Sequence, residues 1–169
     1  MVNDIVASSN NNGVAAVGSD VTLQLVIFSL LGEEFGVSIH DVREIISNTQ
    51  ITPVPQAPDF VEGVINLRGQ IIPVVDLRKR FSLEENQNKD DSNVVIIEVD
   101  DNVLGLIVDS VSEVLNIPAD SINPPPALVA NGIGAEYIKG IGQYNEKMII
   151  LIDLQKVFSA DELKSITEV

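Results

Sequence analysis

The 169-residue chain contains no cysteine, no tryptophan and only one histidine. Without cysteine it can form no disulfide, no thiol-based active site and no cysteine-ligated zinc site. Aromatic residues make up 4% of the chain and apolar residues 45%, so its core must be mainly aliphatic. Valine and isoleucine dominate the apolar set, and β-branched side chains favour pleated strands over helices. The composition therefore favours an all-β fold.

Basic residues are also scarce. Ten lysines and arginines stand against 25 acidic residues, which gives a formal net charge of −15. A chain this acidic is repelled by nucleic-acid phosphates and by anionic membrane surfaces, so neither is an expected partner. No apolar run approaches the ~20 residues that cross a bilayer, and no basic segment precedes an apolar one as in a signal peptide. We expect a cytoplasmic protein without direct membrane insertion.

Residues that could carry out a reaction are missing as well. His40 is the single histidine, and no nucleophile elbow accompanies it. One histidine and scattered carboxylates do not have metal-ligand spacing. The glycines at 132, 134, 140 and 142 lead toward a strand rather than a helix, unlike a phosphate-binding loop. The sequence predicts no enzyme, no cofactor and no metal site.

The chain does contain an internal repeat. Residues 61–82 (VEGVINLRGQIIPVVDLRKRFS) align without a gap with residues 138–159 (IKGIGQYNEKMIILIDLQKVFS) at an offset of 77, with seven identities in 22 positions. Residues 26–46 align with residues 95–115 at an offset of 69. A longer, proline- and glycine-rich segment of the second copy absorbs the difference. Two gapless blocks in the same order indicate a tandem duplication of a small β unit.

Each copy has about five short strands separated by turns, a pattern typical of a small SH3-like barrel. A single copy is too short to be comfortably stable alone, so the two copies are expected to pack together. The expected domain organisation is a flexible tail at residues 1–22, a first β-barrel at 23–82, an acidic linker at 83–93, a second β-barrel at 94–159 and a C-terminal helix at 160–169.

Helix signals are few. Asp76 precedes LRKRF and can cap a short helix there. Ser159 and Glu162 have the spacing of a capping box, which predicts the start of the C-terminal helix. Ser82 and Glu85 share this spacing but lead into the polar linker.

Three segments carry a family resemblance: GVINLRGQIIPVVDLR, EEFGVSIHDVREII and ITPVPQAPDFVEG. Together with VLGLIVDSVSEVLNI they resemble the CheW-type chemotaxis coupling domain, over about residues 23–163. The resemblance implies two five-stranded SH3-like barrels about a pseudo-twofold axis. It also implies a non-enzymatic adaptor, recruited to receptor arrays, that binds the regulatory domain of the histidine kinase CheA and the cytoplasmic tip of a chemoreceptor.

The same resemblance assigns residues to the two partners, with the receptor tip in a groove between the barrels. Receptor binding falls on six residues: Val42, Glu44, Gly63, Arg68, Val111 and Val114. Kinase binding falls on Ile39 and Ile45. From the residues alone, the valines and isoleucines could equally be core, and Arg68 a solvated charge at a hairpin tip.

Two other functions stay open at this point. The chain could couple a receptor and kinase of a pathway other than chemotaxis. It could also be a small-molecule-binding β-barrel, although the sequence supplies no convergent set of polar groups for such a pocket.

Overall fold

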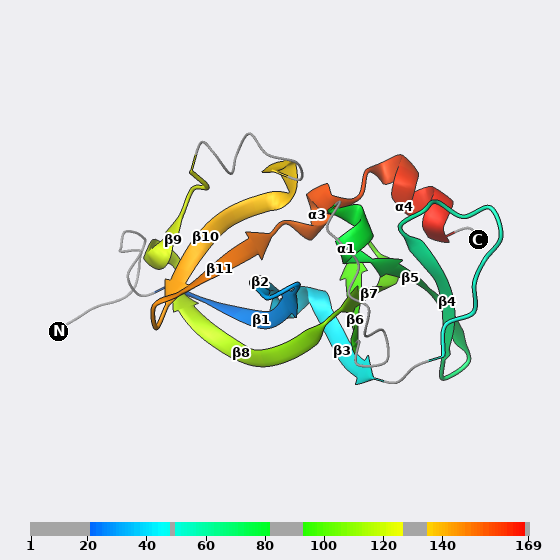
Figure 1. Cartoon of the computed structure of the whole chain (residues 1–169), viewed down its shortest axis with the longest axis horizontal. Coiled ribbons are helices and arrows are strands. Elements are labelled where there is room, and N and C mark those ends of the chain that lie inside the picture. The colour runs from blue at the N-terminus through cyan, green and yellow to red at the C-terminus, as the bar shows by residue number, and fades with distance from the viewer. Residues whose placement is uncertain (1–20, 48–49, 82–92, 127–134, 168–169) are drawn as a thin grey trace, which may run out of the picture.

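A computed structural model describes residues 21–47, 50–81, 93–126 and 135–167. The expected tail, linker and first capping box fall outside these residues, apart from Val21, Thr22 and Asn93. The described chain consists mainly of β-strands in two sheets that lie side by side (Figure 1), with a few short helices. The all-β fold class is confirmed.

Sheet A has the strand order β8-β1-β2-β11-β10-β9. Its neighbouring strands are antiparallel except for β2 and β11, which run parallel. The strands of sheet A are β1 (Thr22–Leu30), β2 (Glu33–Ser38), β8 (Ser110–Pro118), β9 (Ile122–Asn123), β10 (Ile138–Tyr144) and β11 (Lys147–Ile152).

Sheet B has the strand order β3-β6-β7-β5-β4. It too is antiparallel with one parallel pair, between β5 and β7. An isolated bridge between Thr52 and Val64 continues it beyond β4, where sheet A has the two-residue strand β9. The strands of sheet B are β3 (Val42–Ser47), β4 (Val61–Leu67), β5 (Gln70–Asp76), β6 (Asn93–Val99) and β7 (Asn102–Val108).

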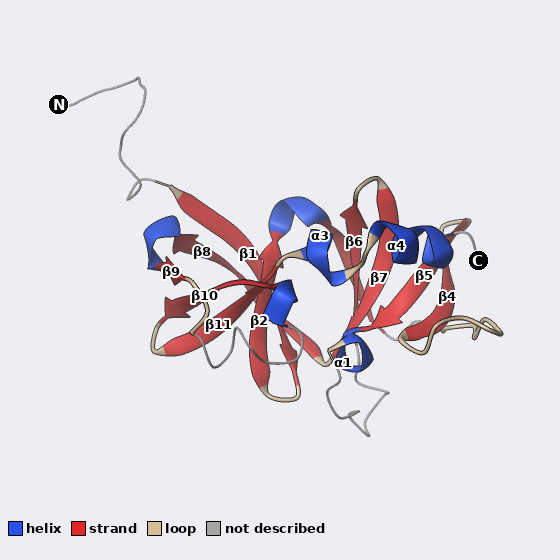
Figure 2. Ribbon diagram, turned by 90° about the horizontal axis from the view of Figure 1, so that it is seen from above, coloured by secondary structure: helices blue, strands red, loops and turns tan. Residues whose placement is uncertain are grey.

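Short helices follow the last strand of each copy of the repeat, β5 in the first and β11 in the second. The side chain of Asp76 accepts a hydrogen bond from Arg78 N and caps α1 (Leu77–Arg80), as the sequence predicts. Asp153 caps α3 (Leu154–Val157) in the same way through Gln155 N. A reciprocal capping box of Ser159 and Glu162 starts α4 (Ala160–Thr167), which lies against sheet B near β5 and β7 (Figure 2). The remaining helical turns are 3₁₀: η2 (Ile39–Asp41), η4 (Ala119–Ser121) and η5 (Ala135–Tyr137).

None of the described helices could span a lipid bilayer, since the longest, α4, has eight residues.

The strand registers reproduce the internal repeat. Val74 lies opposite Gly105 across the parallel pair of sheet B, and Leu151 lies opposite Gly36 across that of sheet A. These four residues are related by the offsets of 77 and 69 found in the sequence. The bulges recur as well, between Val61 and Gly63 in β4 and at the equivalent place in β10. The structure therefore confirms the duplication.

The expectation of one barrel per copy is wrong, because the copies exchange strands. The hairpin of β1 and β2, from the first copy, lies in sheet A with the strands of the second. In return, β6 and β7 complete sheet B. In Figure 1 the blue hairpin accordingly lies beside the yellow and orange strands. Sheet B is thus formed by residues 42–108, and sheet A by the segments before and after them. This division differs from the expected barrels at residues 23–82 and 94–159.

Burial shows how the exchanged strands are held in the two sheets. Both β1 and β6 are apolar on both faces, and each strand lies between two clusters of buried side chains. In β1, Leu25 and Ile27 face a cluster inside sheet A, while Val26 and Phe28 belong to a central cluster. The equivalent residues of β6 do the same in sheet B. An exchanged strand therefore buries two apolar faces at once, which keeps ~25 cal/mol per Å² of apolar area out of water.

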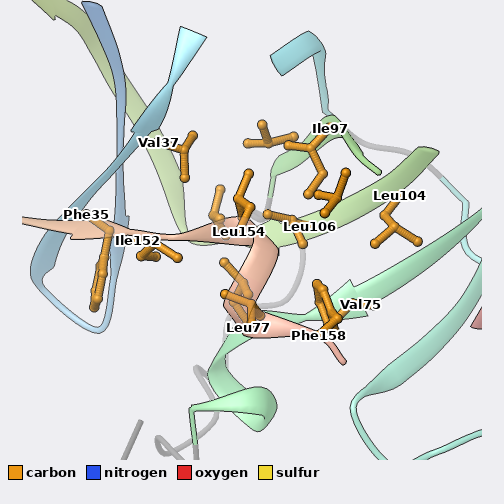
Figure 3. Close-up of a cluster of buried hydrophobic side chains, with 14 of the residues drawn as sticks. Phe35, Val37, Val75, Leu77, Ile97, Leu104, Leu106, Ile152, Leu154 and Phe158 are labelled. Atoms are coloured by element: carbon orange, nitrogen blue, oxygen red, sulfur yellow. The ribbon is translucent and has the colours of Figure 1, made fainter. Parts of the chain in front are cut away.

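The central cluster joins the two sheets into one core. It draws residues from strands of both sheets and from the three helices. Figure 3 shows Phe35, Val37 and Ile152 of sheet A on one side of this cluster and Val75 and Leu106 of sheet B on the other. At its edge the tilted rings of Phe60 and Phe158 lie against each other, and the repeat-related pair of Tyr137 and Phe81 is stacked. The two sheets therefore share one hydrophobic interior.

Candidate functional site

Glu44 and Arg68 form an ion pair on the surface of sheet B. Arg68 occupies the turn between β4 and β5 with a φ of 51°, and Glu44 lies on edge strand β3. The guanidinium donates two hydrogen bonds to the carboxylate, one of them with an Nη1–Oε1 distance of 3.3 Å. This hydrogen bond lowers the pKa of Glu44 and raises that of Arg68. The pair is therefore ionised at neutral pH, and the Arg68 side chain stays 71% exposed.

Val42 and Val111 are related by the repeat and lie at equivalent places. Val42 begins β3 opposite Ile97, and Val111 lies near the start of β8 opposite Phe28. Both side chains are half-buried and pack against the central cluster. Each valine therefore has a structural role and retains some exposed surface.

Val114 and Ile45 are exposed apolar residues. Val114, on edge strand β8, is 47% exposed, and Ile45, on edge strand β3, is 43% exposed. This excludes the alternative that these two residues are core. They are also related by the repeat, although the family resemblance assigns them to different partners. The two sheets thus present the same apolar feature on two separate edge strands.

The other two predicted residues are less accessible. Ile39, in η2, is half-buried and packs against the central cluster. Gly63 is buried in β4 with a φ of +153°, where a Cβ atom would lie 2.1 Å from the backbone oxygen of Thr52. That approach leaves no space for any side chain. Gly63 therefore allows the chain at residues 52–53 to lie close to β4.

A buried ion network escapes the sequence analysis. Arg78 is 1% exposed, and its guanidinium donates to both oxygens of Asp76, at 3.1 and 3.3 Å. It also donates to Asp109 Oδ1 at 3.0 Å, and Asp109 Oδ2 accepts from Leu31 N at 2.6 Å. The network links the end of sheet B to the β1–β2 turn of sheet A. The sequence does hold a signal for this network. The repeat aligns Arg78 with Gln155, so the arginine is particular to the first copy.

Arg80 forms a second unpredicted cluster at the junction. Its guanidinium lies 4.8 to 5.6 Å from the ring centroids of Phe60, Tyr137 and Phe158. It donates two hydrogen bonds of 2.8 Å to Glu162 and one to the backbone oxygen of Val157. Arg80 therefore fastens α4, at the end of the second copy, to α1, at the end of the first.

Within the described residues, no group of three or more histidine and carboxylate side chains is arranged to hold a metal ion. The predicted residues form protein surfaces: two edge strands with exposed apolar side chains, and an ion pair at a hairpin tip.

Comparison with known proteins agrees with this reading. The model of the CheW-like domain matches residues 24–162. A chemotaxis protein CheW of Klebsiella aerogenes is 36% identical over 152 residues, which cover 90% of this chain and 91% of that protein. A chemotaxis protein CheW of Treponema pallidum is 38% identical, covering 88% and 89%.

A solved structure is also similar, that of the scaffolding protein TtCheW from Thermoanaerobacter tengcongensis. It superposes with a TM-score of 0.76 at 42% identity, covering 84% of this chain and 96% of that one. Family model, relatives and structure all extend over nearly the whole described fold. The chain therefore belongs to the CheW-like family.

Proposed function

We propose that this chain is a non-enzymatic adaptor that couples chemoreceptors to the histidine kinase CheA in the cytoplasm, at receptor arrays. The observation that carries the proposal is the near full-length match to proteins named as chemotaxis proteins and to one named as a scaffolding protein. A protein that only joins two partners needs two separate surfaces and no reaction centre.

Receptor binding is proposed for the surface that includes Val42, Glu44, Arg68, Val111 and Val114, with Gly63 supporting it from below. A helical receptor tip needs apolar contacts and a few polar groups that fix its register. The exposed part of Val114 supplies the first and the guanidinium of Arg68 the second. A planar guanidinium suits a carboxylate or the carbonyl groups at a helix end.

Kinase binding is proposed for Ile45 and Ile39, on β3 and the turn before it. Ile45 supplies an exposed apolar side chain on an edge strand, and Ile39 lies at the start of the adjoining 3₁₀ turn. Such apolar residues serve as anchors when a partner excludes water from them.

The repeat provides a matched pair of variants that tests this division. Ile45→Asp and Val114→Asp make the same change at equivalent edge-strand positions of similar exposure, so they should affect folding similarly. We expect Ile45→Asp to weaken binding of the CheA regulatory domain about tenfold or more and to spare receptor binding. Val114→Asp should do the opposite. Titration of each purified variant with both partner fragments measures this, and equal losses for both partners would contradict the division.

The ion pair offers a second test. Arg68→Ala should weaken receptor binding about tenfold or more, because a hydrogen bond to a charged group contributes ~1.5–3 kcal/mol. The control is Asn145→Ala, at the equivalent turn of sheet A, which should leave receptor binding unchanged. If Arg68→Ala binds the receptor fragment as the unmodified protein does, Arg68 is a surface charge without a role in coupling.

A further inference from the structure

A pocket in sheet A occupies the place that a guanidinium fills in sheet B. It has a volume of about 290 Å³ and lies among β1, β2, η2, β11 and α3. Its walls include Asp153, Gln155 and His40, which the repeat relates to Asp76, Arg78 and Asp109, the three members of the buried ion network. The two halves of the chain thus offer the same niche, one filled and one open.

The filled niche shows which group such a site accepts. In sheet B, Asp76 caps a short helix with one oxygen and binds the guanidinium of Arg78 with both. In sheet A, Asp153 caps the equivalent helix through Gln155 N, but the side chain two residues later is an exposed glutamine. Glutamine carries no charge and is shorter than arginine, so the carboxylate of Asp153 faces the pocket without the partner that Asp76 has.

The charges of the niche also correspond. Sheet B places two carboxylates, Asp76 and Asp109, around the guanidinium. The pocket in sheet A likewise has two, Asp153 and Asp41, the latter one position beyond the equivalent of Asp109. Lys139 also lines the pocket. In the described part of the chain, however, no ion pair joins Lys139 to either carboxylate.

The inner wall of the pocket suits the stem of an arginine side chain. Leu25, Leu151 and Leu154 are buried residues that line it. Arginine places its methylene groups along such apolar surface while its guanidinium reaches polar partners. His40 and Gln155 at the rim are exposed, so the pocket is accessible from outside.

We propose that this pocket binds an arginine side chain presented by a partner protein, in the manner of Arg78 in the other half of the chain. The planar fork of the guanidinium matches a carboxylate better than an ammonium group does. None of the residues that line the pocket is among the receptor and kinase residues named above, although Ile39 lies in the same 3₁₀ turn, and the test uses neither of those partners.

The test is a titration of the full chain with N-acetyl-arginine amide, followed by NMR at the backbone amides of residues lining the pocket. We expect saturable shifts there, and much weaker ones with N-acetyl-lysine amide. Asp153→Asn keeps the helix cap but removes the charge, and it should weaken binding about tenfold or more. Asp100→Asn, a control at an exposed turn of sheet B, should have no effect.

Two variants copy sheet B into sheet A. Gln155→Arg supplies the chain with its own guanidinium, so it should abolish binding of the capped arginine while the protein stays folded. His40→Asp supplies the equivalent of Asp109, and it should tighten binding about threefold to tenfold.

Several results would overturn the proposal. One is a titration without saturable shifts in the pocket. Another is capped lysine binding as well as capped arginine, which would show that any cation suffices. A third is free arginine binding where the capped form does not, which would make the site one for the amino acid and not for a protein side chain. A fourth is an equal loss of arginine affinity in Asp153→Asn and Asp100→Asn, which would show that only the overall charge of the protein matters.

Discussion

Asp109 is a polar residue at the junction of the two sheets whose loss should destabilise the fold. Asp109→Ala removes one of the two carboxylates that neutralise Arg78, a side chain only 1% exposed. It also removes the oxygen that accepts from Leu31 N at 2.6 Å. A hydrogen bond to a charged group contributes ~1.5–3 kcal/mol, and a buried charge that loses a partner costs more. Since Asp76 still holds Arg78, we expect a loss of about 2–4 kcal/mol in the free energy of unfolding.

Urea unfolding followed by circular dichroism measures this loss, because the chain has no tryptophan to report on unfolding. For a chain of this size each kcal/mol lowers the melting temperature by about 2–4 °C, so a fall of about 4–16 °C is expected. His40→Ala is the matched control, since the repeat relates His40 to Asp109 and His40 is exposed. It should stay within about 0.5 kcal/mol of the unmodified protein. An Asp109→Ala variant as stable as that control would refute the reasoning.

Two further predictions concern packing and pH. Gly63→Ala should destabilise the fold by about 3 kcal/mol or more, because its Cβ would lie 2.1 Å from Thr52 O and its φ is +153°. Gly69→Ala, where no atom lies within 4 Å of the new Cβ, should cost only about 1 kcal/mol in the same unfolding assay, and equal losses would contradict the steric argument. At Glu162 burial acts most strongly and raises the pKa, but hydrogen bonds from Ser159 and the charge and hydrogen bonds of Arg80 together lower the pKa below its ordinary 4.5. The ionised Glu162 therefore stabilises the fold above pH 4.5 and loses this effect as the pH falls through the lower folded-state pKa. Glu162→Gln should flatten the acid limb of a stability–pH curve, and an unchanged limb would count against the Arg80–Glu162 contact.

The duplication was predictable because equivalent residues have the same structural role in both copies. Gly63 and Gly140 follow bulges, and Asp76 and Asp153 cap helices, so the same residue types recur at fixed offsets. The strand exchange was not predictable from that pattern. A repeat tells which residues correspond, but the same hydrogen-bond registers are satisfied whether a hairpin pairs within its own copy or with the other. The strand order in the structure distinguishes the two arrangements.

The candidate site was predictable in part. Family resemblance and not residue chemistry selected Glu44 and Arg68, and the structure brings the two together as an ion pair. The sequence could not separate exposed from buried aliphatic residues, because valine and isoleucine occur on both the buried and the exposed face of a strand. It takes the structure to show that Ile45 and Val114 are exposed while Val42 is partly covered. Whether these residues bind the proposed partners stays a prediction.

The exchange of strands also fixes an order of events during synthesis. Sheet B is built from one continuous stretch, residues 42–108, whereas sheet A needs β1 and β2 from before that stretch and four strands from after it. As the chain emerges from the ribosome, sheet B is complete while the first hairpin still lacks β8 and β11, the strands on either side of it. The edges of this hairpin stay unpaired until the last third of the polypeptide has been made. Unpaired apolar edges of this kind are prone to aggregation. A ribosome pause after β7 should therefore leave a folded sheet B and an exposed β1–β2 hairpin, which makes this interval the one in which the nascent protein most needs a chaperone.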